Sequence, residues 1–340
     1  MASSQISETE LKIVYFDILN GYTKIDNSIL GKDLYVKHLN VFDSIGTDKD
    51  YKKSFNRAKG LGIPTEEEQL KYLAKEDLWT DEREGELTEL KGALLNLEQT
   101  KSQLFLKSQI ESIKEEISET QQQIDGLTLQ RAELMGMTAE IFASKKANEG
   151  FMLKVLYDDE KFQTPALPEE KYDSLSDQKL NELMAQYSVR TKNLSMGQLR
   201  KIAISTFFVN FFYLAEDNPY TFYGKPIVQL TYYQSELFAL GRYFKHLASE
   251  AKTKPPPEIA EDPEKLIEFY ETRKNAEEFM EKNEARSKHD GSGGTSIVGA
   301  TQEDLQNMGY SKAQQGVDLH KYAASKGGSL NMQDFIELHS

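Results

Sequence analysis

The chain has 340 residues, 39 % of them hydrophobic, and its 55 acidic and 41 basic residues give a net charge of −14 at pH 7. That length can bury at least one large core, whereas the negative charge argues against nucleic acid or an anionic membrane as the main partner, because both attract a basic surface. The absence of cysteine excludes disulfides and thiolate metal sites and agrees with a reducing cytoplasm.

Residues 1–80 predict a small α+β module. The opening lacks a basic stretch followed by an apolar one, so we expect no signal peptide. A short helix should end near Gly21, and the alternation in TKIDNSILGKDLYVKHLN predicts two β-strands around a turn at residues 27–33. This is the only convincing strand pattern in the chain.

Two further helices complete the predicted module. The first is expected over residues 48–59. The second begins at Thr65, because Glu68 follows three residues later and forms a capping box with it. This helix leads to Trp79, the only tryptophan, which we take as an interface candidate.

Residues 81–136 predict an antiparallel helical hairpin. Leucine and isoleucine recur at heptad-compatible spacing in a charged, Gln-rich sequence. A break is expected at residues 102–107, because Ser108 and Glu111 form a capping box that restarts the helix. Two interpretations stay open: the apolar stripes bury only each other, or the tip or flank of the hairpin contacts a neighbouring subunit.

Residues 137–286 predict a helical core rich in aromatic residues. The helices expected here span residues 138–157, 177–187, 195–215, 226–251 and 263–286. Pro226 suits the first position of the fourth helix, where its missing N–H costs nothing. The apolar stripe of that helix includes Leu237.

An aromatic block at residues 207–244 holds 13 of the 35 aromatic residues of the chain. So much apolar surface must form a core or a docking site. Within the block, the turn at residues 216–226 is our best candidate for a recognition loop, with Tyr220, Phe222 and Tyr223 as candidate interface residues.

The C-terminal part reads as a flexible linker at residues 287–300, rich in Gly and Ser, followed by a small three-helix module at residues 301–340. The module resembles the second half of an EF-hand, but oxygen ligands are missing and Asp334 stands in place of the bidentate Glu. It also resembles the Met-Gly-aromatic loop of ubiquitin-associated domains. We expect a small helical module without calcium.

No catalytic or metal-binding motif emerges. The five histidines are dispersed, the Gly-rich segment at residues 291–296 lacks the lysine and strand of a phosphate loop, and no GxSxG elbow is present. We therefore expect no catalytic residues, no metal and no cofactor. An enzyme whose site is assembled only by the fold ranks third among the functional hypotheses.

Four segments resemble structural or assembly proteins of the tails and baseplates of tailed bacteriophages, especially marine phages with contractile tails. They read GKDLYVKHLN, GIPTEEEQLKYLAKEDLW, MTAEIFASKKANE and NPYTFYGKPIVQLTYYQSELFALGRYF. With the segments between them, they span about two thirds of the chain. The resemblance implies a non-enzymatic subunit or chaperone that binds other tail proteins, in the virion or the host cytoplasm. The module from Thr301 onward has no recognised counterpart.

The sequence thus predicts a mainly α protein with a small α+β N-terminal module, a projecting antiparallel helical hairpin and a helical core. The leading functional hypothesis is a phage tail or baseplate structural or assembly component acting through protein–protein contacts. Its partners would be other tail or baseplate proteins, with homo-oligomers left open, and neither nucleic acid nor membrane. The alternative is an adaptor or small-ligand binding protein that uses the turn at residues 216–226.

Overall fold

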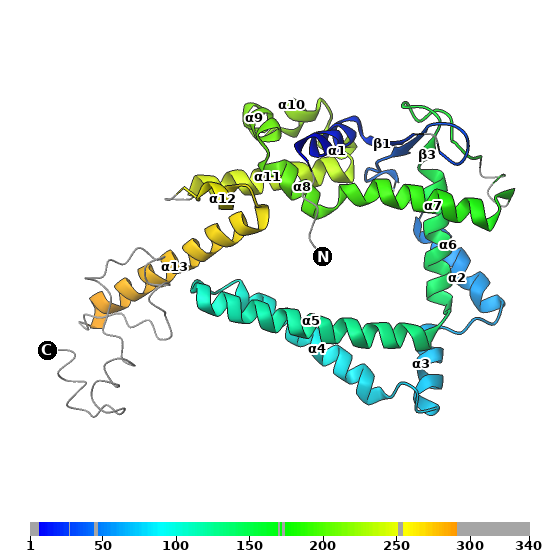
Figure 1. Ribbon diagram of the computed structural model, residues 1–340, viewed down its shortest axis with the longest axis horizontal. Coiled ribbons are helices and arrows are strands. Elements are labelled where there is room, and N and C mark those ends of the chain that lie inside the picture. The colour runs from blue at the N-terminus through cyan, green and yellow to red at the C-terminus, as the bar shows by residue number, and fades with distance from the viewer. Residues whose placement is uncertain are drawn as a thin grey trace. The chain divides into compact units, whose positions relative to one another are not determined.

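The computed structural model describes residues 7–26, 28–43, 47–168, 171, 174–250 and 254–290. The described chain is mainly α-helical with one small antiparallel sheet near the N-terminus, which confirms the predicted fold class (Figure 1). It divides into two compact units. Among the described residues, unit 1 lies within Met1–Glu86 and Leu127–Ile267, and unit 2 holds Leu87–Gly126 and the part of α13 from Glu268 to Asp290. The predicted linker beyond Asp290 and the predicted module at residues 301–340 lie outside the described residues.

Helix α1 (Glu8–Asn20) opens unit 1. The Ser7 hydroxyl accepts from the Glu10 N–H while the Glu10 carboxylate accepts from the Ser7 N–H, a capping box that fixes where the helix begins. It ends at Gly21, whose φ of 80° lies in the left-handed region that glycine adopts without strain. The predicted stop near Gly21 is confirmed.

The sheet contains the two predicted strands and a third that the sequence pattern did not predict. Strands β1 (Tyr22–Ile25) and β2 (Leu34–Lys37) pair antiparallel, and β3 (Leu156–Tyr157) adds to the other edge of β2. The helix expected over residues 138–157 is therefore shorter than predicted: α6 (Ala139–Lys154) ends before β3. Two residues are too few to show strand alternation, and only the partner strand makes them a strand.

One hydrophobic core joins the sheet to α6 and α7. Its buried members are Ile25, Leu34, Val36, Met152, Leu153, Val155, Leu156, Ala166, Leu167 and Leu183. These residues come from both sides of the module boundary predicted at residue 80. The N-terminal strands and the middle of the chain are thus stabilised by the same burial.

Helices α2 (Thr47–Gly60) and α3 (Glu66–Lys75) agree with the helices expected before Trp79. The predicted capping box is present, since the Thr65 side chain accepts from the Glu68 N–H and the Glu68 carboxylate accepts from the Thr65 N–H. Helix α2 packs along α6. Three acidic residues in the first turn of α3 face the positive end of its dipole.

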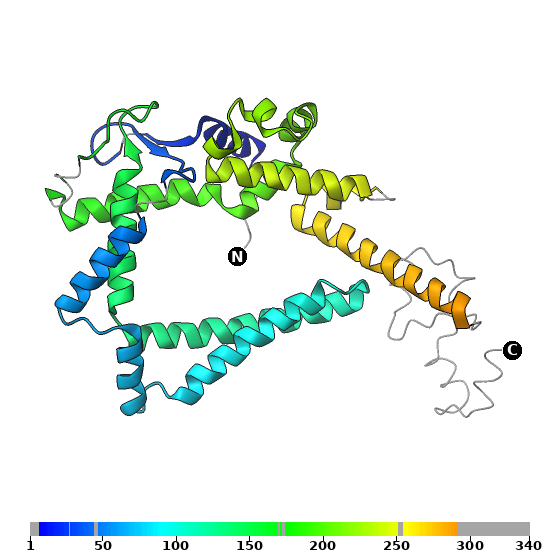
Figure 2. The same cartoon turned by 180° about the vertical axis from the view of Figure 1, so that it is seen from behind.

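The predicted hairpin is formed by α4 (Asp81–Lys101) and α5 (Lys107–Met135), which lie side by side in both views (Figures 1 and 2). The break predicted at residues 102–107 is confirmed. The predicted capping box is wrong, because α5 already begins at Lys107 and Ser108 lies inside its first turn.

In unit 2 the hairpin turn packs against α13 (Pro263–Asp290). The Asn275 side chain donates to the Ser102 carbonyl at 2.8 Å. The rings of Phe105 and Phe279 lie 5.0 Å apart. The turn of the hairpin therefore contacts another helix of the same chain.

The remaining helices of unit 1 carry the aromatic block. They are α7 (Asp177–Thr191), α8 (Met196–Ile204), α9 (Thr206–Leu214), α10 (Pro219–Tyr223), α11 (Tyr232–Glu250) and α12 (Pro257–Ala260). Ser176 caps α7 as predicted. Both views show that α1, distant in sequence, lies beside α9 and α11 (Figure 2).

Two predictions about these helices are corrected. The helix expected over residues 195–215 is broken at Ser205, whose backbone is extended and whose hydroxyl donates to the Lys201 carbonyl at 2.7 Å. Pro226 does not begin a helix. Helix α11 starts after Thr231, which exchanges capping hydrogen bonds with Gln234. The phase predicted for α11 is confirmed, because Leu237 is fully buried.

Candidate functional site

The aromatic block forms a core of interlocking rings. Phe208 and Phe212 of α9 are stacked at 5.3 Å and are almost fully buried. Phe212 meets Phe238 of α11 edge-on at 5.1 Å, and Phe222 of α10 meets Phe208 at 5.5 Å. Edge-to-face packing of this kind stabilises beyond the area it buries. It holds α9, α10 and α11 in fixed relation.

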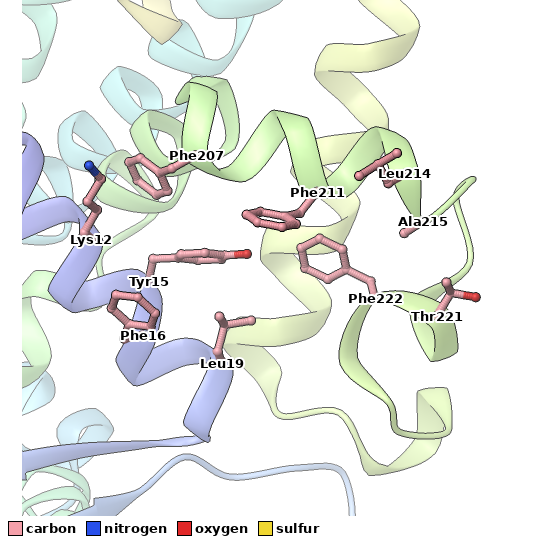
Figure 3. A pocket seen from close by; sticks show the side chains of 10 residues that line it. All are labelled: Lys12, Tyr15, Phe16, Leu19, Phe207, Phe211, Leu214, Ala215, Thr221 and Phe222. Atoms are coloured by element: carbon pink, nitrogen blue, oxygen red, sulfur yellow. The ribbon is translucent and has the colours of Figure 1, made fainter.

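Another face of α9 is only partly covered. Between it and α1 lies an open groove of about 560 Å³, closed at one end by α10 (Figure 3). The groove is lined by Lys12, Tyr15, Phe16, Leu19, Phe207, Phe211, Leu214, Ala215, Thr221 and Phe222. All of these residues belong to unit 1.

The rim of this aromatic groove is strongly exposed. Phe16 is 58 % exposed, Phe211 63 % and Leu214 77 %. Single exposed apolar residues are ordinary, but several that share one concave face mark an interaction site. The groove is therefore the strongest candidate for a functional surface among the described residues.

Lys12, Tyr15 and Thr221 add polar groups to the apolar lining. The Lys12 ammonium lies 5.6 Å from the centre of the Phe207 ring and pairs with Glu8 at 2.8 Å. Tyr15 is only 6 % exposed, and its hydroxyl points between Phe211 and Phe222 (Figure 3). Burial raises the pKa of Tyr15 to about 12, so that this hydroxyl stays protonated at neutral pH.

The turn predicted as a recognition loop, residues 216–226, contains the short helix α10. Tyr220 is 61 % exposed, as an interface residue should be. Phe222 packs into the ring core, and the Tyr223 hydroxyl donates to the Gln234 carbonyl at 3.0 Å. Burial raises the pKa of Tyr223. The loop is thus anchored by the packing of Phe222 and the hydrogen bond of Tyr223, and of the three candidate residues only Tyr220 is exposed to solvent.

Trp79 is corrected as an interface candidate. It is 1 % exposed and packs with Leu73 and Met135 where the hairpin joins α3. Its indole Nε1–H donates to the Glu84 carboxylate at 2.7 Å, and Arg131 pairs with the same carboxylate at 2.8 Å. A ring so enclosed cannot reach a partner, and its role is to hold the base of the hairpin.

Sequence reasoning missed Phe16, Phe211 and Leu214. A usable signal was present, because residues 207, 211 and 214 recur at helical spacing on a face of α9 next to the one that carries the buried pair Phe208 and Phe212. A helix apolar on every side must either be buried all round or expose one face. The missing information was that α1 covers only part of that face.

A buried polar network connects α1 with the sheet. His38 Nε2 lies 2.9 Å from the Thr23 hydroxyl, while His38 Nδ1 is buried without a partner. Burial lowers the pKa of His38 to about 4. Burial also raises the pKa of Asp17 to about 6, opposed by a hydrogen bond from Thr23 and by the charge of Arg190. His38 and Thr23 are buried and Asp17 is half-buried, and none of the three lines the aromatic groove.

Within the part of the chain that the structure describes, no three or more His, Cys, Asp or Glu side chains are grouped to hold a metal ion. The described helices include none with the length and apolarity needed to cross a membrane. Comparison with protein families, curated proteins and solved structures finds no match.

Proposed function

We propose that this chain is a non-enzymatic structural or assembly component of a bacteriophage tail or baseplate, acting through protein–protein contacts. The resemblance of four sequence segments to such proteins supports the class. The virion or the host cytoplasm would then be its location. Its partners would be other tail or baseplate proteins.

The exposed aromatic groove is the observation that carries the proposal. Aromatic and leucine side chains on rigid helices are the residues that anchor protein interfaces, since they bury large areas while losing little conformational entropy. Phe211 and Leu214 lie on a helix whose neighbouring face packs into the ring core. A surface presented in this way needs little ordering before it binds.

Co-purification with candidate tail and baseplate proteins tests the proposal. The parent chain should retain a partner that Phe211→Ser with Leu214→Ser loses, because both changes remove apolar contact area at exposed positions. Leu95→Ser with Leu129→Ser is the matched control, since these hairpin leucines are 55 % and 61 % exposed. Equal retention by all three proteins would contradict a role for the groove.

A second candidate is binding of a small apolar ligand. The groove volume of about 560 Å³ falls within the range of roughly 300–1,000 Å³ found for ligand pockets. Thr221 and Phe222 contribute to it from the turn expected to form such a pocket. Saturable binding of decanoate that Phe211→Ser abolishes, with no protein partner retained, would favour this candidate.

A further inference from the structure

Both walls of the aromatic groove are helical stripes. The α1 wall is made by residues 12, 15, 16 and 19 and the α9 wall by residues 207, 211 and 214. Each wall runs over eight residues, whose seven steps of 1.5 Å cover roughly 10 Å or two helical turns. A groove between two helices over this length has the shape that a third helix fills by ridges-into-grooves packing.

The two ends of the groove differ in charge. Figure 3 shows Lys12 and Phe207 at one end and Leu214 and Thr221 at the other. Lys12 is the one charged side chain among the described residues that line the groove, and its ion pair with Glu8 is exposed and therefore weak. An occupant with a carboxylate at this end is therefore favoured, although the chain as a whole is acidic.

The Tyr15 hydroxyl supplies a second, independent indication of an occupant. Buried tyrosine hydroxyls usually find a hydrogen-bond partner. The side chain of Tyr15 is more than nine-tenths buried and its hydroxyl points into the groove, yet no hydrogen bond joins that hydroxyl to any described residue. The groove thus has a polar atom on its floor as well as apolar walls.

We propose that the aromatic groove binds an amphipathic helix of a partner protein. The helix presents an apolar stripe of two turns to Phe16, Phe211 and Leu214. It places an acidic residue at the Lys12 end and a hydrogen-bonding atom at the Tyr15 hydroxyl. This inference rests on the proposed function and names the chemistry of its partner.

The occupant is a helix rather than an enclosed small molecule because the rim residues stand out from the walls. A small ligand has most of its surface buried by its pocket, whereas a groove with a rim more than half exposed leaves one side of its occupant open. A helix that continues beyond the groove keeps its polar face on that open side.

Two synthetic amphipathic peptides of about 14 residues, roughly 21 Å as helices, provide the probes. They share one leucine stripe and differ only in carrying Glu or Lys at the terminus that meets Lys12. Fluorescence anisotropy with the full chain should show the Glu peptide binding roughly two- to fivefold more tightly, the effect of one exposed ion pair. Lys12→Glu should reverse that preference.

Variants locate the binding. Phe211→Ser should lose both peptides, Leu129→Ser should bind like the parent, and Tyr15→Phe should weaken binding while the melting temperature changes little. A parent chain that binds neither peptide at concentrations up to about 1 mM overturns the inference. Equal affinity for both peptides refutes the preference for an acidic residue at the Lys12 end. Unchanged peptide binding by Phe211→Ser refutes the groove as the binding site.

Sedimentation and ligand titration test the other occupants. A dimer that Phe211→Ser dissociates would mean that a second copy fills the groove, and decanoate binding without peptide binding would assign a small ligand. If a tail or baseplate partner is retained through the groove but neither peptide binds, the proposed function stands and only the helical occupant is refuted. If the Glu peptide binds selectively but no tail or baseplate partner is retained, the proposed function is refuted and the helical occupant is supported.

Discussion

Replacing Gly241 by alanine tests the packing that holds the aromatic groove in place. A Cβ at this position of α11 would lie 2.8 Å from Phe212 Cε2 and 3.0 Å from Phe208 Cε1. Carbon atoms at optimal van der Waals separation lie roughly 3.5–4.0 Å apart, so a ring must move. Phe212 has little freedom to move, because Phe208 and Phe238 enclose it at ring distances of 5.3 Å and 5.1 Å.

Two opposing effects set the magnitude. Alanine is favoured over glycine within a helix by about 1 kcal/mol, whereas forcing an extra carbon into a packed core costs about 1–3 kcal/mol. We expect the clash to win, with a net loss of up to about 2 kcal/mol. Gly150→Ala in α6 is the matched control, since nothing lies within 4 Å of its added Cβ, and it should stabilise by about 0.5–1 kcal/mol.

Thermal melting followed by circular dichroism measures both variants. At roughly 2–4 °C per kcal/mol for domains of about 150–250 residues, Gly241→Ala should melt several degrees below Gly150→Ala. Peptide binding by Gly241→Ala should also weaken, because the displaced ring of Phe212 moves the helix that carries Phe211. A Tm for Gly241→Ala equal to or above that of Gly150→Ala would refute the close approach of α9 and α11.

Leu237→Asp should be far more damaging than Glu236→Ala, because it buries an unpaired charge, and similar chemical denaturation midpoints for the two variants would contradict the helical phase of α11. Trp79→Ala should lower the free energy of unfolding by about 3–5 kcal/mol through cavity formation, and a loss below about 1 kcal/mol would mean that this ring is not a core residue. Between about pH 4 and 6 the folded protein holds a proton on Asp17 that the unfolded chain releases, and lacks a proton on His38 that the unfolded chain binds. The resulting slopes of stability against pH oppose each other. In His38→Gln only the Asp17 effect remains, so the free energy of unfolding should fall as pH rises through this window. In Asp17→Asn only the His38 effect remains, so it should rise. Urea titrations in which the free energy of unfolding has the same slope against pH in both variants would exclude this linkage.

Much of the local structure was predictable because it depends on residues close together in sequence. The capping box of Thr65 with Glu68 and the cap at Ser176 were read correctly, as was the stop at Gly21. Such signals involve hydrogen bonds and backbone preferences that span only a few residues. The buried position of Leu237 followed from the helical period alone.

Errors arose where a long-range partner decided between local alternatives. β3 is a strand only because β2 lies beside it. The break between α8 and α9 is a different case, because the Ser205 hydroxyl donates to the carbonyl of Lys201 only four residues earlier, and this local bond was missed. Trp79 was an interface candidate until the hairpin base enclosed it. Side-chain type states what a residue can do, whereas burial depends on which distant segments pack against it.

The aromatic groove shows the same division. The sequence by itself determined that the block at residues 207–244 has too much apolar surface to stay fully exposed to water. It also determined which residues of each helix share one face. It did not determine which face stays open, because that depends on where α1 lies, some 190 residues earlier in the chain. Tyr15 packs its ring 5.5 Å from Phe207 and leaves Phe211 and Leu214 uncovered. Only the tertiary structure decides this, because burial is a property of two surfaces in contact and the pattern of one segment describes only one of them.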